Sequence, residues 1–325
     1  MKALLLGLRQ NSIVLSKILE MSGVDYVVLA RRSSGSIDKI KMSGISQDRV
    51  LMISEITEFE LLEVHSKFQY SHIFNFAADS FVQDSNLNFS HFVKNNSFLL
   101  FEILKLRSKI PDLWIFHPLS SEIISHGHEI KPQHTPVILD PRNAYGVGKA
   151  LDYFACKVAH EHANMKINFC VMFNHESRYR SRHFFSKKVV NFFQNLGNNN
   201  CNELEIYNCT SQRDWGSAVE YMQLVFQAAS QHLIGETMLG TGHLMSVERF
   251  VDLCISELDL DCTKTLQNGL MIWRGQNFTI REKSRDLSDA QRIMRANSEI
   301  VLKTFKQTPQ IFGASLVREL LNGET

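Results

Sequence analysis

The sequence predicts an α/β fold, with a doubly wound parallel sheet and a smaller C-terminal domain. Over the first half of the 325 residues, short apolar runs alternate with amphipathic stretches. Strands separated by helical segments in this way are typical of parallel βαβ units. After residue 172 the alternation becomes less regular, and the chain is long enough for a second domain.

Each predicted element rests on a local pattern. The apolar runs with the length of buried strands are residues 2–6, 26–30, 50–53, 73–76, 113–117 and 168–173. Helical periodicity lies between them at 13–22, 58–68, 89–107 and 148–164, and again later at 247–258. We therefore expect the parallel sheet within residues 1–172. Residues 173–325 are expected to form mainly the smaller domain, with some segments returning to the first.

The composition is that of an ordinary globular enzyme and argues against several partners. The formal charge of +1 gives no field to attract nucleic acid or an acidic membrane. No apolar run approaches the ~20 residues of a membrane span, and the N-terminus leads directly into a strand pattern. We expect a cytoplasmic protein with six reduced cysteines. No metal is expected, because the H-x-H pair His126 and His128 lies without further ligands nearby.

The turn after the first strand, GLRQNS at residues 7–12, stands where a dinucleotide-binding chain carries G-x-G-x-x-G. Only its first glycine, Gly7, is present. A helix N-terminus still attracts phosphate through its unpaired N–H groups. We therefore expect a Rossmann-like cofactor site in which Arg9, Gln10, Asn11 and Ser12 partly replace the missing glycines. Binding should be weaker than a three-glycine turn gives, because the turn is shortened and Ser12 has a Cβ where the helix should pack close to the strand.

Two arginines, Arg31 and Arg32, follow the second strand, where the adenosine ribose of such a cofactor lies. No acidic residue that would bind a free 2′-hydroxyl ends this strand. The pair therefore favours NADP over NAD, and the alternative interpretation is a solvated turn.

The stretch DPRNAYGVGKALDYF carries candidate catalytic residues. Tyr145 and Lys149 are four residues apart and share one face of a helix. An ammonium close to a phenol lowers the pKa of that phenol and makes it a proton acceptor. Ser120 and Glu122 follow the fifth strand, at the edge of the sheet where ligands bind. Taken alone, the Tyr/Lys pair fits a chance helical spacing better, and the serine and glutamate fit a helix cap equally well.

Longer strings resemble a known family. Together with NFAADSFV at 75–82, these residues resemble the extended short-chain dehydrogenases/reductases. The strings F-N-H-E-S at 173–177 and R-D-W-G at 213–216 look like those of GDP-mannose 4,6-dehydratases, as do ARRSS and GTGHLMSVERF. The resemblance extends from residue 3 to about residue 290.

The resemblance implies a nucleotide-sugar 4,6-dehydratase that acts on a GDP-hexose with recycled NADP. It implies catalytic roles for Ser120, Glu122, Tyr145 and Lys149. The residues that it places beside the cofactor are Gly7, Arg9, Gln10, Asn11, Arg31, Arg32, Glu55, Ala77, Ala78, Ser80, Tyr145, Lys149, His175 and Arg180. Those that it places beside the sugar nucleotide are Ser120, Glu122, Tyr145, Asn174, Lys188, Arg213 and Arg281.

The same resemblance implies a homodimer or homotetramer. The helical stretches 89–107 and 148–164 would form the dimer contact, since they carry Phe92, Phe98, Leu99, Phe101, Tyr153 and Phe154. The chain departs from the family in its cofactor turn, where one glycine is missing and Ser12 replaces another, and at Tyr179, which replaces an arginine. Two alternatives therefore stay open. One is a reductase or epimerase of the same fold, and the other is a non-catalytic protein that binds a sugar nucleotide.

Overall fold

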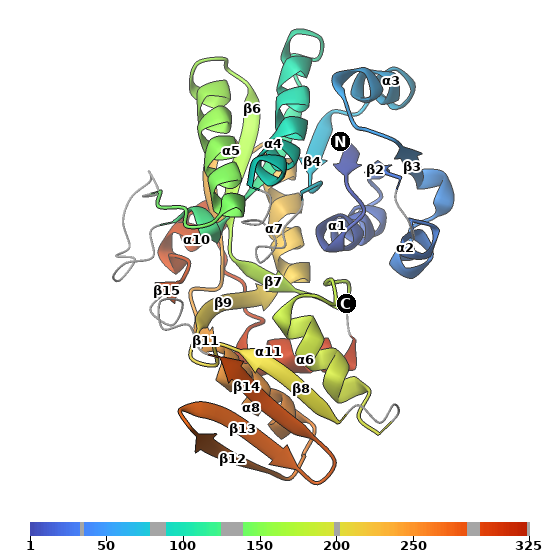
Figure 1. Cartoon of the computed structure of the whole chain (residues 1–325). Helices are drawn as coiled ribbons and strands as arrows, with labels where there is room; N and C mark the ends of the chain where they lie inside the picture. The colour runs from blue at the N-terminus through green and yellow to red at the C-terminus, as the bar shows by residue number, and fades with distance from the viewer. Residues whose placement is uncertain (33–35, 79–88, 125–138, 198–201, 285–292, 324–325) are drawn as a thin grey trace.

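The structure is a computed structural model, and it describes residues 1–32, 36–78, 89–124, 139–197, 202–284 and 293–323. In these residues a large sheet flanked by helices forms one unit, and smaller sheets and helices form a second unit below it in Figure 1. The predicted doubly wound α/β fold is confirmed.

Seven strands form the central sheet in the order β10-β6-β5-β4-β1-β2-β3, and every neighbouring pair is parallel. Their bounds are β1 Lys2–Leu6, β2 Asp25–Arg31, β3 Val50–Ile53, β4 His72–Asn75, β5 Trp114–Ser120, β6 Lys166–Met172 and β10 Gly235–Leu239. The chain runs outward from β1 to β3 and then returns to β4 on the other side of β1. The gap between β1 and β4 is therefore the switch point at which such sheets bind ligands.

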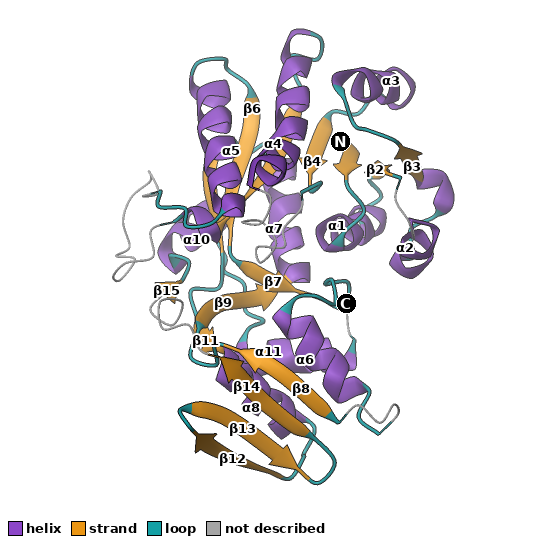
Figure 2. Cartoon of the chain, in the orientation of Figure 1, coloured by secondary structure: helices purple, strands orange, loops and turns teal. Residues whose placement is uncertain are grey.

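Helices cover both faces of this sheet (Figure 2). Helices α4 and α5 pack together, and α1 packs against α7. The bounds of the helices are α1 Gln10–Met21, α2 Ser36–Ser43, α3 Glu58–Phe68, α4 Phe89–Lys105, α5 Ala144–Glu161, α7 Ala218–Ser230 and α10 Ser298–Phe305. Short 3₁₀ turns are η1 Gln47–Arg49, η3 Leu106–Ser108 and η4 Ser121–Ile123.

The apolar runs of the sequence form the strands of this sheet, because a parallel sheet covered by helices buries both faces of each strand. In β6, for example, only the first of seven residues is exposed. The predicted strands 2–6 and 50–53 and the predicted helix 58–68 have the bounds of β1, β3 and α3. The fifth strand is longer than predicted and ends at Ser120, so this residue closes the strand itself.

The smaller unit contains two sheets of four strands. The first consists of β7 Asn174–Glu176, β9 Gln212–Ser217, β11 Leu244–Ser246 and β15 Ile293–Met294. The second consists of β8 Glu203–Tyr207, β12 Cys262–Gln267, β13 Leu270–Gly275 and β14 Thr279–Ser284. The accompanying helices are α6 Phe185–Gln194, α8 Val247–Glu257 and α11 Gly313–Asn322.

Two hydrophobic clusters follow the two units. The larger contains the central sheet and residues between 218 and 239 and between 294 and 305. The smaller gathers residues from 189–215, 245–280 and 316–320. Parts of the second half of the chain therefore pack with the first. Within the described residues, no helix has the length and apolar character that a membrane crossing requires.

Candidate active site

Gly7 ends β1 at the switch point and packs directly against the end of β4. Its φ is +88°, a conformation that L side chains rarely adopt, and a Cβ at this position would lie 2.9 Å from the Cα of Ala77. Its N–H donates to the carbonyl of Leu29 in β2, at 2.9 Å. The first glycine of the predicted cofactor turn is therefore fixed by backbone geometry.

Ser12 replaces the last glycine of the family turn with a hydrogen-bonded hydroxyl. The side chain is fully buried. Its Oγ donates to the carbonyl of Gly7 at 2.5 Å and accepts from the N–H of Arg9 at 3.0 Å. The Cβ that we expected to obstruct the contact between helix and strand is thus accommodated, and the shortened turn is closed from within.

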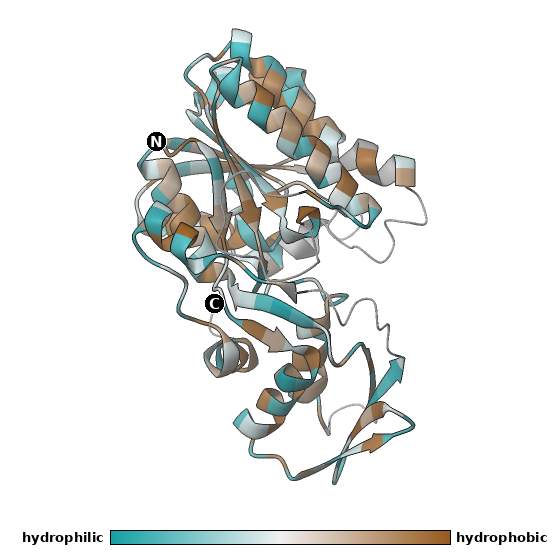
Figure 3. Cartoon of the chain, turned by 90° about the vertical axis from the view of Figure 1, so that its left-hand side faces the viewer, coloured by the Kyte–Doolittle hydropathy of each residue, from teal (hydrophilic) through white to brown (hydrophobic). Residues whose placement is uncertain are grey.

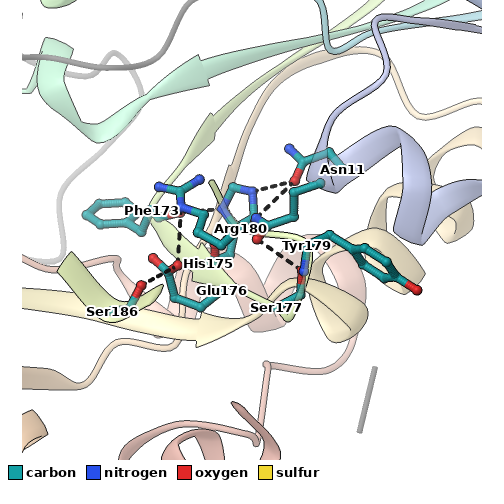
Figure 4. Close-up of polar contacts among 9 residues, drawn as sticks. Asn11, Phe173, His175, Glu176, Ser177, Tyr179, Arg180 and Ser186 are labelled. Atoms are coloured by element: carbon teal, nitrogen blue, oxygen red, sulfur yellow. Dashed lines mark hydrogen bonds and ion pairs between the residues drawn. The ribbon is translucent and has the colours of Figure 1, made fainter. Parts of the chain in front are cut away.

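The side chains of Gln10 and Asn11 hold the F-N-H-E-S segment, and Figure 4 shows the contact of Asn11 with His175. The Gln10 amide donates to the carbonyl of His175 at 2.9 Å and accepts from the hydroxyl of Ser177 at 3.0 Å. Asn11 contacts the Nε2 of His175 at 2.9 Å. These amides therefore join the first turn of α1 to residues 175–177, and the backbone N–H groups of that turn are the groups suited to a phosphate.

Burial lowers the pKa of His175 to about 4, so the ring is neutral near pH 7. Its Nδ1 lies 2.8 Å from the carbonyl of Phe173, and its Nε2 lies 2.9 Å from the Oδ1 of Asn11, which also accepts from the Gln10 amide. A neutral ring carries one N–H, so it donates to one of these two oxygens at a time.

His175 is expected to make the protein sensitive to acid. Its pKa in the folded state lies below the ordinary value of about 6.5, so the unfolded chain binds the extra proton. The stability from the neutral ring is complete above about pH 6.5 and is lost as the pH falls toward about 4. His72, whose pKa is also about 4 through burial, contributes with the same sign.

In thermal melts at pH 7 and pH 5, His175→Gln should lose less stability on acidification than the native chain, whereas His162→Gln at an exposed position should behave like the native chain. An equal loss in all three proteins would contradict this assignment.

Arg180 pairs with the buried carboxylate of Glu176 beside the same segment, and the arginine side chain is 16% exposed (Figure 4). The Arg180 Nε lies 3.2 Å from Oε2 of Glu176, and the hydroxyl of Ser186 donates to the same oxygen at 2.7 Å. Burial raises the pKa of Glu176, and the arginine and serine act in the opposite direction. The carboxylate therefore orients the Arg180 guanidinium toward the cavity described below.

Ser120 and Glu122 lie where β5 passes into the turn η4. The Ser120 Oγ accepts from the N–H of Glu122 at 3.2 Å, so the serine caps this turn. The side chain of Asn143 donates to Glu122 Oε2 at 2.7 Å, and its Oδ1 accepts from the N–H of Gly146 at 2.7 Å. Asn143 is thus both the N-cap of α5 and the group that holds the Glu122 carboxylate. Neither role was predicted from the sequence.

Tyr145 and Lys149 lie on the first two turns of α5 and are both buried. The Lys149 ammonium donates to the carbonyl of Pro118 at 2.9 Å and to Asp152 Oδ2 at 3.2 Å. The predicted helix therefore starts earlier than residue 148 and includes the Tyr/Lys pair.

One cavity, of about 170 Å³, brings most of the predicted residues together at the carboxyl edge of the sheet. Phe76, Met172 and Phe184 supply apolar parts of its wall. The predicted residues among those that line it are Arg9, Gln10, Asn11, Ala78, Ser120, Glu122, Tyr145, Lys149, Asn174, His175 and Arg180. From the sequence, Ser120 and Glu122 fitted a helix cap and a site equally well. In the structure the two residues form a cap and also line this cavity.

A second cavity, of about 300 Å³, continues into the smaller unit. Asn174 and Phe184 line both cavities, so the two adjoin. The predicted residues Lys188 and Arg213 line the second one, together with Trp215. The wall of this cavity thus carries two cations beside an indole ring, and the carboxylates of Glu176 and Glu205 also line it.

Other predicted residues lie outside both cavities. Gly7 and Ala77 form the backbone contact behind the first cavity. Arg31, Arg32 and Glu55 are exposed near the ends of β2 and β3, and exposed Arg281 on β14 pairs with Glu203 at 3.4 Å. Ser80, His126 and His128 fall outside the described residues. In the described part of the chain, no cluster of three or more His, Cys, Asp or Glu side chains is arranged to hold a metal.

The parallel sheet, the helix N-terminus at its switch point and the buried Tyr-x-x-x-Lys pair define an extended short-chain dehydrogenase/reductase. The family model for GDP-mannose 4,6 dehydratase matches residues 12–305. The chain belongs to the GDP-mannose 4,6-dehydratase family, and the family predicted from the F-N-H-E-S and R-D-W-G strings is confirmed.

Individual relatives agree with this assignment. The GDP-mannose 4,6-dehydratase of Sinorhizobium fredii is 27% identical over 260 residues, 76% of this chain and 73% of the relative. The GDP-mannose 4,6 dehydratase of Dictyostelium discoideum is 25% identical over 243 residues, 73% of this chain and 65% of the relative. The human GDP-mannose 4,6 dehydratase is 24% identical over 290 residues, 85% of this chain and 74% of the relative.

Solved structures agree on the fold. The dTDP-glucose 4,6-dehydratase of Bacillus anthracis has a TM-score of 0.79 at 15% identity, over 100% of this chain and 96% of that chain. The UDP-glucose 4-epimerase of Thermus thermophilus has a TM-score of 0.78 at 13% identity, over 99% and 98%. At these identities the likeness establishes the fold alone.

Proposed function

We propose that this chain is an NADP-dependent 4,6-dehydratase that converts GDP-mannose, or a related GDP-hexose, to its 4-keto-6-deoxy form. The observation that carries the proposal is that Ser120, Glu122, Tyr145 and Lys149 line one cavity at the sheet switch point. Residues 1–172 would hold the cofactor, and residues 173–325 would mainly hold the sugar nucleotide.

Each catalytic side chain has a role that its surroundings support. Tyr145, with Lys149 beside it, takes the proton of the sugar 4-hydroxyl, and Ser120 donates a hydrogen bond to the same oxygen. A bound nicotinamide would supply the hydride chemistry, taking hydride at C4 and giving it back at C6. Glu122 removes the proton at C5, which the 4-ketone has made acidic, and protonates the leaving 6-hydroxyl. C5 regains a proton when C6 is reduced, which balances the proton that Tyr145 took, so the net change is the loss of water. Asn143 holds that carboxylate in place.

Glu122 favours dehydration over the alternative reactions of this fold. A reductase or an epimerase moves hydride and a hydroxyl proton at C4, and the Tyr/Lys pair suffices for both. Removal of the C5 proton needs a further base. Glu122 lines the same cavity as Tyr145 and is fixed by Asn143, which is the arrangement such a base requires.

The residues present fit a nicotinamide dinucleotide. Gly7 brings β1 and β4 into close backbone contact, and the first turn of α1 lines the cavity and can receive the pyrophosphate. Dehydratase and epimerase relatives in solved structures carry NAD. For this chain we propose NADP instead, because exposed Arg31 ends β2, exposed Arg32 follows it, and both supply cations for a 2′-phosphate.

The second cavity is the proposed place of the nucleoside diphosphate. Lys188 and Arg213 offer cations, and arginine matches phosphate geometry through its fork of donors. Asn174 lies at the junction with the first cavity, where the sugar would pass between them. Arg281 remains a predicted nucleoside contact that would exchange Glu203 for the ligand.

The proposal is tested by incubating the purified chain with GDP-mannose and either NADP⁺ or NAD⁺. The expected result is a product lighter by one water, with tighter binding of NADP⁺ than of NAD⁺ in titrations of the apo-protein. UDP-glucose and dTDP-glucose serve as controls for the base. Absence of product and of cofactor binding would favour the non-catalytic alternative, for which the shortened glycine turn is the supporting feature.

We also propose that the chain forms a homodimer or homotetramer through α4 and α5. Among the side chains predicted for this contact, Leu99 and Tyr153 are core, whereas Phe101 and Phe154 are 43% and 57% exposed. Phe92 lies outside the side chains that the structure describes. Exposed Leu151 and Val158 extend the apolar face on α5. Figure 3 shows apolar residues along these helices.

Replacing Phe154 with aspartate is expected to give monomers, because a carboxylate on this face would lose its hydration in the dimer. Light scattering at micromolar concentration measures the outcome. The control is Leu266→Asp on β12, an apolar side chain that is 64% exposed and lies in the smaller unit. A native chain that is monomeric under these conditions would contradict the proposal.

A further inference from the structure

A buried polar chain lies beneath the Tyr/Lys pair, and the proposed mechanism does not use it. Asp152 Oδ2 accepts from the Lys149 ammonium at 3.2 Å and lies 3.0 Å from Nε2 of His117. The other ring nitrogen of His117 lies 3.1 Å from the side-chain nitrogen of Asn75 at the end of β4. All four residues are 3% exposed or less.

The hydrogen bonds fix the protonation of this chain. Burial, and then the nearby charge of Lys149, lower the pKa of His117, which is therefore neutral. Its Nε2–H donates to Asp152, and its Nδ1 accepts from Asn75. Burial disfavours the Asp152 carboxylate, but the Lys149 ammonium and the His117 donor together hold its pKa below the usual range. The chain is thus an ion pair backed by a neutral imidazole.

A buried ammonium needs such a partner. Taking a charge out of water costs several kcal/mol unless it is paired and hydrogen-bonded. The Pro118 carbonyl supplies one acceptor to Lys149, and Asp152 supplies the opposite charge. We propose that Asp152, oriented by His117, is a positioning residue that keeps the Lys149 ammonium charged and fixed beside Tyr145. The inference rests on the proposed function only in the roles given to Tyr145 and Lys149.

Asp152 also moderates the field at the phenol. A carboxylate 3.2 Å from the ammonium offsets part of the positive potential that Tyr145 experiences. Apart from His117, a described titratable group that interacts with both Lys149 and Asp152 is Cys156 on α5. It is a neutral thiol, because burial raises its pKa. The α4 and β4 neighbours, Ser97 and Asn75, carry no charge. Removing the carboxylate should therefore act on both the lysine and the tyrosine.

The first test measures how fast Lys149 reacts with acetic anhydride at pH 8, read by peptide mass spectrometry on the full chain. In Asp152→Asn this lysine should react at least about threefold faster, because the carboxylate that pairs with the ammonium and holds it in place is gone. The matched control on the same helix is Glu161→Gln, which breaks the exposed pair with Lys157 and should leave the reactivity of Lys149 unchanged. Unchanged reactivity of Lys149 in Asp152→Asn would overturn the proposal.

The second test is a double-mutant cycle in thermal unfolding. Lys149→Met leaves a buried carboxylate unpaired, and Asp152→Asn leaves a buried ammonium unpaired, so each should lower Tm. The double variant should be more stable than Lys149→Met alone, even if Asp152→Asn by itself yields no folded protein. A double variant less stable than Lys149→Met would show that the two side chains do not form a compensating pair.

Neither readout needs a substrate, so a failed dehydratase assay would leave this test intact. Where activity is measured, the pH profile of kcat/KM provides a third readout. The profile of Asp152→Asn should move to lower pH, since no carboxylate then offsets the positive charge of the Lys149 ammonium beside the Tyr145 phenol. A lower rate with an unmoved profile would indicate a merely structural role and would overturn the proposal.

Discussion

Glu122→Gln is expected to abolish dehydration, with kcat lower by about 10²–10⁴-fold, while cofactor and substrate binding stay close to those of the native chain. The glutamine amide cannot take the proton at C5. Its oxygen can still accept the hydrogen bond that Asn143 donates to the carboxylate at 2.7 Å. The turn η4 also keeps the cap between Ser120 Oγ and the N–H of residue 122, since the cap uses backbone at this position.

The measurement is single-turnover formation of the 4-keto product, together with titrations of NADP⁺ and GDP-mannose. Glu63→Gln is a suitable control, because it changes an exposed carboxylate paired only with Lys67 on α3. Full activity in Glu122→Gln would mean that the residue serves as a cap alone. Loss of binding in parallel with the rate would mean that the variant distorts the cavity.

The fold was predictable from the sequence because its main strands are buried on both faces. Such strands appear as continuous apolar runs, and β1 and β3 were located at their bounds. The second half gave a weaker signal. Five of the six residues of β12 are exposed, so this edge strand carries no apolar period. The small sheet containing β12 could therefore not be predicted from hydrophobic pattern.

The positions of the proposed site residues could be predicted where they depend on one element, and could not be predicted where they depend on contacts between distant residues. The spacing of Tyr145 and Lys149 on one helix and the position of Ser120 at a strand end are local properties. The contact of His117 with Asp152 joins residues 35 positions apart, and no local pattern indicates it. Ser12 was expected to disturb the turn, because its sequence position shows a Cβ but not the two backbone groups that its hydroxyl satisfies.

The R-D-W-G string supports stability in addition to its proposed binding role, and Asp214→Asn is expected to reveal this. Asp214 is fully buried on β9. Its Oδ1 accepts from the N–H and the hydroxyl of Thr241, at 3.0 Å and 2.5 Å. Its Oδ2 accepts from the N–H groups of Gly242 and Ala296, at 2.9 Å and 3.0 Å. One carboxylate thus joins β9 to two distant segments of the chain.

An asparagine at position 214 has one accepting oxygen instead of two, so its NH₂ group would face two donors. Leaving such donors unsatisfied in a buried site should cost about 3 kcal/mol, which lowers Tm by roughly 4–5 °C in a chain of this length. Thermal unfolding at pH 7 measures the change, with Asp112→Asn at an exposed ion pair to Lys166 as the control that should unfold like the native chain.

The Asp214 contacts also hold the strand that carries Arg213, and Arg213 lines the second cavity. Affinity for the nucleoside diphosphate should therefore weaken in Asp214→Asn along with stability, and a variant that kept native Tm but lost affinity would assign Asp214 to binding instead.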